Sequence, residues 1–94
     1  MNGARGEVAL MIGGAERRLC LTLGALAQIE TAFGCSSMAE LQVRLKHLSA
    51  GELMQVVAAL MRGGGETVGD LSAADLSPGA AAKAVAEAFR AALG

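Results

Sequence analysis

Few side chains in this 94-residue chain could carry out catalysis or bind a metal, and their spacing favours neither. His47 is the only histidine, and it lies between Lys46 and Leu48 at the end of a predicted helix. No group of cysteines or carboxylates surrounds it at the spacing that metal ligands need. A helix C-terminus favours a cation, so His47 is better interpreted as a structural or solvated residue. We predict no metal and no cofactor.

The two cysteines, Cys20 and Cys35, are the remaining candidate nucleophiles. They do not form a CxxC motif. A reactive thiolate needs a nearby cation or a helix N-terminus, and only Cys35 precedes a predicted helix start, at Ser37. Neither cysteine has a base within obvious reach. We therefore predict reduced thiols in a cytoplasmic chain, and no enzyme.

The run Gly63-Gly64-Gly65 could suggest a loop that binds phosphate. Such a loop needs a strand before it, a helix after it and a Lys-Ser/Thr pair. Here the glycines follow a predicted helix and precede Glu66, whose charge would repel phosphate. We interpret the run as a helix stop followed by a flexible joint. The Gly13-Gly14 pair, which lies between two predicted strands, fails the same test.

The distribution of charge argues against nucleic acid as a partner. The formal net charge is −1 and the eight basic residues are spread along the chain, whereas nucleic-acid binders gather them on one face. The only basic cluster, Arg17-Arg18, is interpreted as solvated protection of a strand edge. No apolar run approaches the roughly 18–20 residues that cross a bilayer, and the first residues lack the apolar stretch of a secretory signal. No membrane partner is predicted.

The clearest structural pattern is a β-hairpin that leads into an amphipathic helix, between Gly6 and Gly34. Residues 7–12 alternate, a turn follows at residues 13–16, and residues 18–23 alternate again. The apolar residues of both strands share one face, which a helix must cover. They are Val8, Leu10, Ile12, Leu19, Leu21 and Leu23.

Four helices are predicted after the hairpin, and their start signals are specific. Thr22 can cap the first helix and Gly34 can end it in a left-handed conformation. Two capping boxes, Ser37 with Glu40 and Ser49 with Glu52, open the second and third helices, and Ser77-Pro78 opens the last. Glu40 and Arg44 are spaced for a helical ion pair. The predicted helices span residues 23–33, 38–48, 50–62 and 78–93.

These elements predict a single α+β domain over residues 1–94, with a two-stranded antiparallel hairpin at 6–23 packed against a bundle of about four helices. Residues 63–77 are the connector, in which an optional helical turn runs from Leu71 to Leu76 with Ser72 as its cap.

Four residues are candidates for partner binding. Methionine fills gaps in cores, which is the default interpretation, but it also suits adaptable binding surfaces. A two-stranded sheet leaves two unpaired edges, so we expect it to accept a partner by edge pairing or by packing of a second copy, as a homo-oligomer. The candidates are Met11, Cys20, Met54 and Met61.

Several stretches in combination resemble a known family. They are Gly6-Glu7-Val8, the run RLCLTLGAL from Arg18 to Leu26, Ile29-Glu30, Phe33-Gly34 and the run RGGG from Arg62 to Gly65. Over roughly residues 5–65 the chain resembles the gene transfer agent family of small tail proteins, with a weaker match over the C-terminal helix. That family is related to phage tail assembly chaperones and also carries a tail-tube label.

The resemblance implies a non-enzymatic role in the assembly of a phage-like tail, in the bacterial cytoplasm. A tail assembly chaperone would bind tape-measure or tail-tube protein and shield the apolar tape-measure helices until the tube polymerises. The alternative is a structural minor component retained in the particle. A tube wall needs a larger continuous sheet than two strands, and this chain is short, so the chaperone is favoured. On that interpretation Met54→Asp with Met61→Asp should weaken tape-measure binding.

Overall fold

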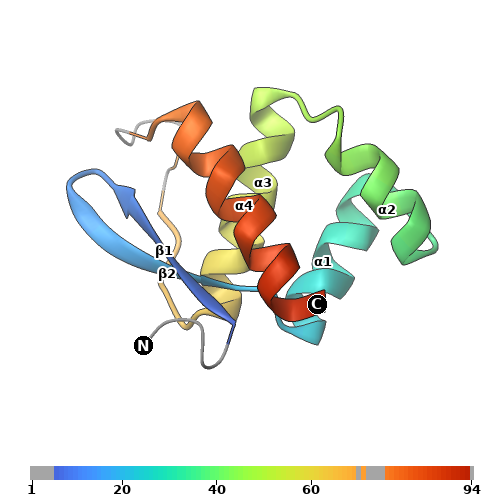
Figure 1. Cartoon of the computed structure of the whole chain (residues 1–94), viewed down its shortest axis with the longest axis horizontal. Coiled ribbons are helices and arrows are strands. Elements are labelled where there is room, and N and C mark those ends of the chain that lie inside the picture. The colour runs from blue at the N-terminus through green and yellow to red at the C-terminus, as the bar shows by residue number, and fades with distance from the viewer. Residues whose placement is uncertain (1–5, 70, 72–75, 94) are drawn as a thin grey trace.

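The computed structural model describes residues 6–69, 71 and 76–93, and it confirms the predicted α+β fold. A two-stranded antiparallel hairpin is followed by four helices (Figure 1). The predicted turn between Leu71 and Leu76, capped by Ser72, falls mainly on residues 72–75, which lie outside the described residues. The elements are β1 (Glu7–Ile12), β2 (Ala15–Cys20), α1 (Leu23–Phe33), α2 (Met38–Leu45), α3 (Ala50–Gly63) and α4 (Pro78–Leu93).

The hairpin turn is tighter than predicted. Ile12 pairs with Ala15, so the turn consists of Gly13 and Gly14 alone, and β2 begins three residues before Arg18. Both glycines have positive φ values, 62° and 82°, as a two-residue turn between twisted strands requires. The sequence pattern missed this start because Ala15 and Glu16 are both exposed and carry no alternation signal.

Leu23 was wrongly placed on the buried face of the hairpin. β2 ends at Cys20, and Leu21 is still buried, but Leu23 is the first residue of α1 and is 83% exposed. Thr22 caps this helix as predicted, since its hydroxyl accepts a hydrogen bond from the Ala25 N–H at 3.1 Å. The change from strand to helix geometry at Thr22 turns the next side chain outward.

The other helix termini follow their predicted signals with two exceptions. Ser49 and Glu52 form the complete capping box of α3, and Ser77 Oγ accepts from the Ala80 N–H at the start of α4. At α2, however, Glu40 Oε1 accepts from the N–H and hydroxyl of Ser36, at 2.6 and 3.0 Å, and Ser37 only accepts from the Glu40 N–H. The predicted reciprocal box is therefore displaced by one residue.

The second exception is the end of α2, which lies at Leu45 and not at Leu48. The Lys46 and His47 N–H groups bond to the carbonyl oxygens of Val43 and Arg44, in a tighter turn than an α-helix. This turn redirects the chain into the Ser49 cap of α3, so the last predicted turn of α2 cannot form.

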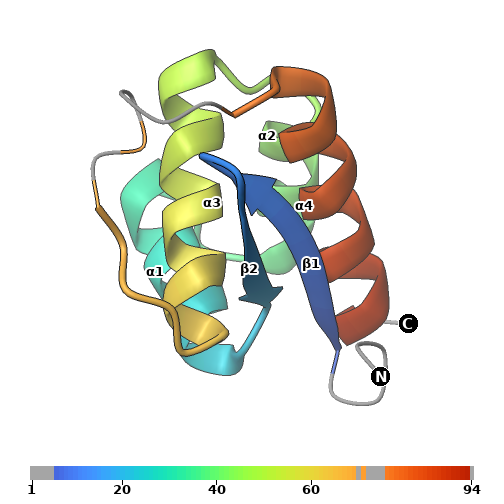
Figure 2. The same ribbon diagram turned by 90° about the vertical axis from the view of Figure 1, so that its left-hand side faces the viewer.

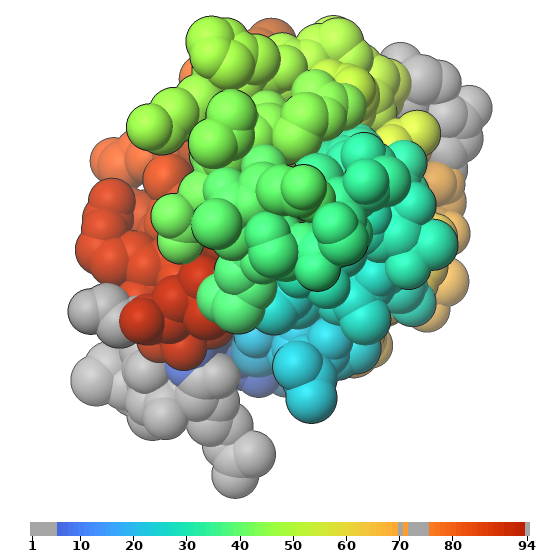
Figure 3. All heavy atoms as spheres, turned by 90° about the vertical axis from the view of Figure 1, so that its right-hand side faces the viewer, coloured from blue at the N-terminus to red at the C-terminus, as the bar shows by residue number. Residues whose placement is uncertain are grey.

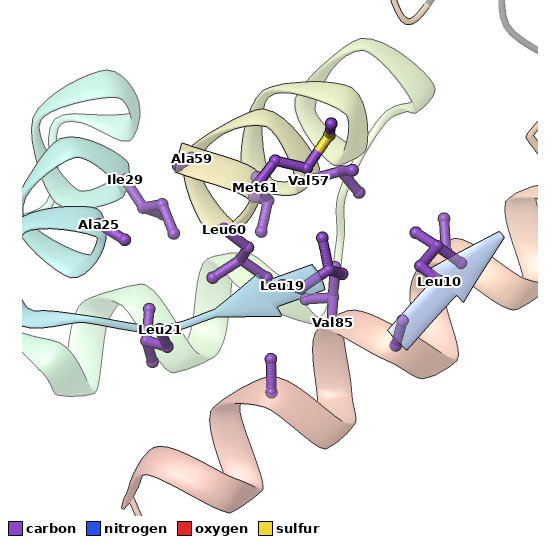
Figure 4. Close-up of a cluster of buried hydrophobic side chains, with 14 of the residues drawn as sticks. Leu10, Leu19, Leu21, Ala25, Ile29, Val57, Ala59, Leu60, Met61 and Val85 are labelled. Atoms are coloured by element: carbon purple, nitrogen blue, oxygen red, sulfur yellow. The ribbon is translucent and has the colours of Figure 1, made fainter. Parts of the chain in front are cut away.

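The core lies between the hairpin and the helices. One face of the hairpin packs on α3 and α4, α1 packs on the opposite side of α3, and α2 packs on α1 at the far end from the hairpin (Figures 1 and 2). Figure 4 shows Leu19 from β2 in the centre of this core, with Leu60 from α3 and Val85 from α4 around it. Alanines at the buried face of α4, among them Ala81, Ala84 and Ala88, allow that helix to lie close to the hairpin.

Candidate partner-binding surface

The four predicted binding residues do not form one surface. Met61 lies in the core and is only 2% exposed (Figure 4). The prediction that it contacts a partner is therefore wrong, because its side chain is buried. It follows Leu60 on the α3 face that packs against the rest of the core. Met54 is half-buried and lines a cavity of about 240 Å³ between α3 and the start of α4. The two methionines thus belong to different environments.

Met11 and Cys20 lie on the face of the hairpin that is turned away from the helices. Met11 is 57% exposed, and Cys20 is half-buried at the other end of the same face. In Figure 2 the hairpin is seen in front of α3 and α4, with this outer face toward the viewer. The pair therefore marks a sheet surface that is separate from Met54.

The glycine run covers the outer edge of β2, a role that the sequence pattern did not reveal. Gly63 and Gly64 lie so close to the strand that a Cβ at either would overlap a backbone oxygen, of Cys20 or of Arg18 respectively. Gly65 has a φ of +80° and closes α3, with the Glu66 N–H bonded to the Met61 carbonyl at 2.9 Å. The run is therefore a packed contact and not simply a flexible joint.

Glu66 completes the cover over β2 by pairing with both neighbouring arginines. Its carboxylate accepts from the Arg18 backbone N–H at 3.0 Å and from Arg18 Nε at 3.4 Å, and lies 3.5 Å from Arg17 Nη1. Its side chain is only 15% exposed. The arginine side chains are 42% and 57% exposed, in keeping with the predicted solvated protection of a strand edge, but the sequence did not indicate that a carboxylate 48 residues away joins them.

Glu66 makes the stability of this edge depend on pH. The Arg18 backbone N–H holds the pKa of Glu66 below its ordinary value, with the two guanidinium groups adding to the effect. The folded state favours the ionised form of Glu66. Its contribution to the free energy of unfolding is therefore complete above the pKa that Glu66 has in the unfolded chain, and it is lost as pH falls through the pKa in the folded state. We expect the wild-type Tm to fall more steeply than that of Glu66→Gln between about pH 5 and pH 3 in thermal melts. Parallel Tm curves for the two proteins would contradict this role.

An open apolar groove lies between α2 and α4, here named the α2–α4 groove. Its main part encloses about 430 Å³, a volume typical of binding pockets. Figure 3 looks onto α2 in green with α4 in red beside it, and the groove follows the boundary between them. Its apolar lining comes from both helices and from the start of α3, mainly Leu45, Leu48, Leu53, Val85, Phe89 and Leu93.

The groove exists because α4 carries a second apolar stripe. One face of α4 packs on the hairpin, but Ala82, Ala86, Phe89 and Leu93 recur at spacings of three and four on a neighbouring face. Ala82 and Ala86 are exposed, and Leu93 is 45% exposed. This apolar stripe lies open between α2 and α4, so we take it as the candidate binding site.

The other wall, α2, is held in place by a few contacts. Leu41 is its one buried residue, and its main helix neighbour is α1. Arg44 bonds to Glu52 at 2.5 Å and lies over the Phe33 ring, 5.2 Å from the centroid, instead of making the predicted pair with Glu40. The Ser49 N–H and Arg44 lower the pKa of Glu52. These contacts fix α2 at the distance from α4 that keeps the groove open.

The described residues include no group of three or more histidines, cysteines or carboxylates that could hold a metal ion. Neither Cys20 nor Cys35, both within the described chain, forms a disulfide. None of the helices that the structure describes is long and apolar enough to cross a membrane. Of the two cavities named here, the main part of the α2–α4 groove, at about 430 Å³, is larger than the cavity beside Met54, at about 240 Å³.

Comparison with protein families gives a match to the family described as phage tail tube protein, GTA-gp10, over residues 5–94. Comparison with curated proteins and with solved structures gave no match. The matched range includes the hairpin, all four helices and both walls of the α2–α4 groove. The chain therefore belongs to the gene transfer agent tail family that carries the phage tail tube description.

Proposed function

We propose that this protein is a non-enzymatic tail assembly chaperone, which binds the tape-measure or tail-tube protein in the cytoplasm before the tail is built. Its family relates it to the structural proteins of gene transfer agent and phage tails. The observation that carries the proposal is the α2–α4 groove, whose apolar walls have no covering element among the described residues.

The form of the groove suits a helix. Its walls are two helices, and its lining also includes Leu48, in the turn before α3, and Leu53, in the first turns of α3. An amphipathic helix binds such a groove by inserting side chains from one stripe, which removes apolar surface from water on both partners. Tape-measure helices need this kind of cover while no tube surrounds them, so a groove for an apolar helix supports the chaperone role.

Co-expression with the tape-measure and tail-tube proteins of the same gene cluster tests the proposal. We expect stoichiometric recovery of the tape-measure protein on the tagged chain, a complex size by light scattering that accounts for both, and absence of the chain from mature particles. Recovery of neither protein would contradict the chaperone role.

A single substitution should locate the binding to the groove. Ala86 is exposed on the groove face of α4, so Ala86→Glu keeps a good helix former but fills the groove with a charged side chain. We expect recovery of the tape-measure protein to fall at least tenfold, about 1.4 kcal/mol or more. The matched control is Leu23→Asp, which adds the same charge at a residue that is 83% exposed and outside the groove. Equal loss in both variants would argue against the groove.

A second candidate function is a structural component that stays in the finished tail. The outer face of the hairpin favours it, because Met11 is exposed there and could pack on a neighbouring subunit. Mass spectrometry of purified particles separates the two functions. Presence of the chain at a fixed stoichiometry would support the structural role, and Met11→Asp should then lower its incorporation.

A further inference from the structure

We propose that the α2–α4 groove selects an amphipathic helix that carries acidic residues beside its apolar stripe, near the C-terminal end of α4. This inference rests on the same site as the proposed function, but it concerns the chemistry of the occupant and not the identity of the tail protein that supplies it. The charges that line the groove, and their positions along it, carry the inference.

The charged residues that line the groove are all basic. Lys46 follows the last turn of α2 and Arg90 lies on α4, so one cation stands on each wall. Both side chains are exposed, and within the described chain neither forms an ion pair. No aspartate or glutamate of the described residues lines either part of the groove. A helix with acidic flanks would therefore be attracted, and one with basic flanks would be repelled.

The two cations also give the occupant a direction. The main part of the groove contains Lys46 but not Arg90, whereas the adjoining part of about 370 Å³ contains both, together with Phe89 and Leu93. Lys46 thus lines both parts of the groove, and Arg90 adds a second positive charge only in the part near Leu93. A helix with its acidic residues at one end meets both cations only when that end lies near Leu93, so the groove favours this orientation.

The probes are two synthetic peptides of about 18 residues, or five helical turns. Both carry the same leucine stripe, one has glutamates beside the stripe near one end, and the other has lysines at those positions. Binding to the full chain is measured by fluorescence anisotropy. We expect the glutamate peptide to bind about tenfold more tightly, because two attractions replace two repulsions, and raised salt should reduce the difference.

Charge reversal tests the assignment to the two residues. In Lys46→Glu with Arg90→Glu, the preference should reverse in favour of the lysine peptide. Lys83→Glu is the matched control, since it places the same change on an exposed residue of α4 outside the groove lining, and it should keep the wild-type preference. Circular dichroism and thermal melts check that each variant is folded. If the charge-reversed variant does not fold, Lys46→Gln with Arg90→Gln replaces it, and this variant should bind both peptides equally.

The outcomes separate this inference from the proposed function. Equal binding of both peptides, undiminished binding to Ala86→Glu, or a dimer of the chain that excludes both peptides would overturn the inference. If neither peptide binds while the tape-measure protein is still recovered, the inference fails and the chaperone role stands. If the glutamate peptide is preferred and reversed as expected while no tail protein is recovered, the inference stands and the chaperone role fails.

Discussion

Alanine at Gly63 or at Gly64 is expected to destabilise the folded domain by about 3 kcal/mol each, at the upper end of the cost of overpacking. The new Cβ would overlap the backbone oxygen of Cys20 or of Arg18, and backbone cannot rotate away as a flexible side chain can. Domains of this size have about 5–15 kcal/mol of stability, so the double variant should be largely unfolded or aggregated. Urea unfolding followed by circular dichroism measures the loss.

Gly51→Ala is the matched control for this prediction. Gly51 lies in the first turn of the same helix, α3, and a Cβ there would meet nothing within 4 Å. Alanine is the better helix former by about 1 kcal/mol, so this variant should be slightly more stable than the wild type. If Gly63→Ala behaved like Gly51→Ala, the close contact between the end of α3 and β2 would not exist in solution.

Met61→Asp is expected to unfold the domain rather than to weaken partner binding. Met61 is 2% exposed, so the substitution places a carboxyl group in the core beside Leu60, at a cost of about 4 kcal/mol or more. Chemical denaturation of the free protein measures this cost. A loss of tape-measure binding in this variant would therefore report unfolding and not a binding face.

The cost of Met61→Asp should depend on pH in a defined direction. Burial disfavours the ionised carboxylate, so the pKa of the introduced group lies above about 3.9 in the folded state. The folded state then holds the proton more tightly than the unfolded chain does. The loss of stability relative to the wild type therefore grows as pH rises from the pKa of the group in the unfolded chain to its pKa in the folded state. Met61→Leu, which conserves volume, should cost less than about 1.5 kcal/mol at every pH. A deficit independent of pH would show that the introduced carboxyl group is hydrated and that the site is not closed.

Local signals predicted the fold well where one short segment determined the structure. Thr22 and Gly34 set the bounds of α1, and Ser77-Pro78 set the start of α4, because each signal satisfies backbone groups within its own helix turn. The alternation of Leu10 and Ile12 likewise identified the buried face of β1. Such features need no knowledge of distant residues.

Predictions failed where a distant partner decided the outcome. Arg44 bonds to Glu52 and not to Glu40, since α2 turns back toward the start of α3. The sequence indicates only that Glu66 is a polar residue of the connector, whereas in the folded chain it bonds to Arg18. The spacing of residues along the chain contains no information about either ion pair, so hydrophobic periodicity and helical spacing cannot predict them.

The candidate site was the least accessible to sequence reasoning. Methionine type suggested an adaptable surface, but type alone cannot say which methionines a fold buries, and Met61 proved to be core. A better signal was present in α4, where Ala86, Phe89 and Leu93 extend the apolar side of the helix beyond the stripe that one packing face needs. A helix whose apolar residues cover more of its circumference than one packing face needs is therefore the sequence pattern that could have indicated the groove.

The cover over β2 limits how these molecules can associate through their sheets. A strand adds to a sheet only where backbone groups of an edge face outward and are accessible. On β2 the backbone groups of Arg18 and Cys20 lie under Gly63, Gly64 and Glu66, so a strand cannot add to this edge. With one edge of the sheet blocked, copies of the folded protein can pair at most once through their β1 edges, so they cannot form fibres by repeated edge addition. Losing the glycine contact would expose the second edge, and variants at Gly63 should polymerise as well as unfold.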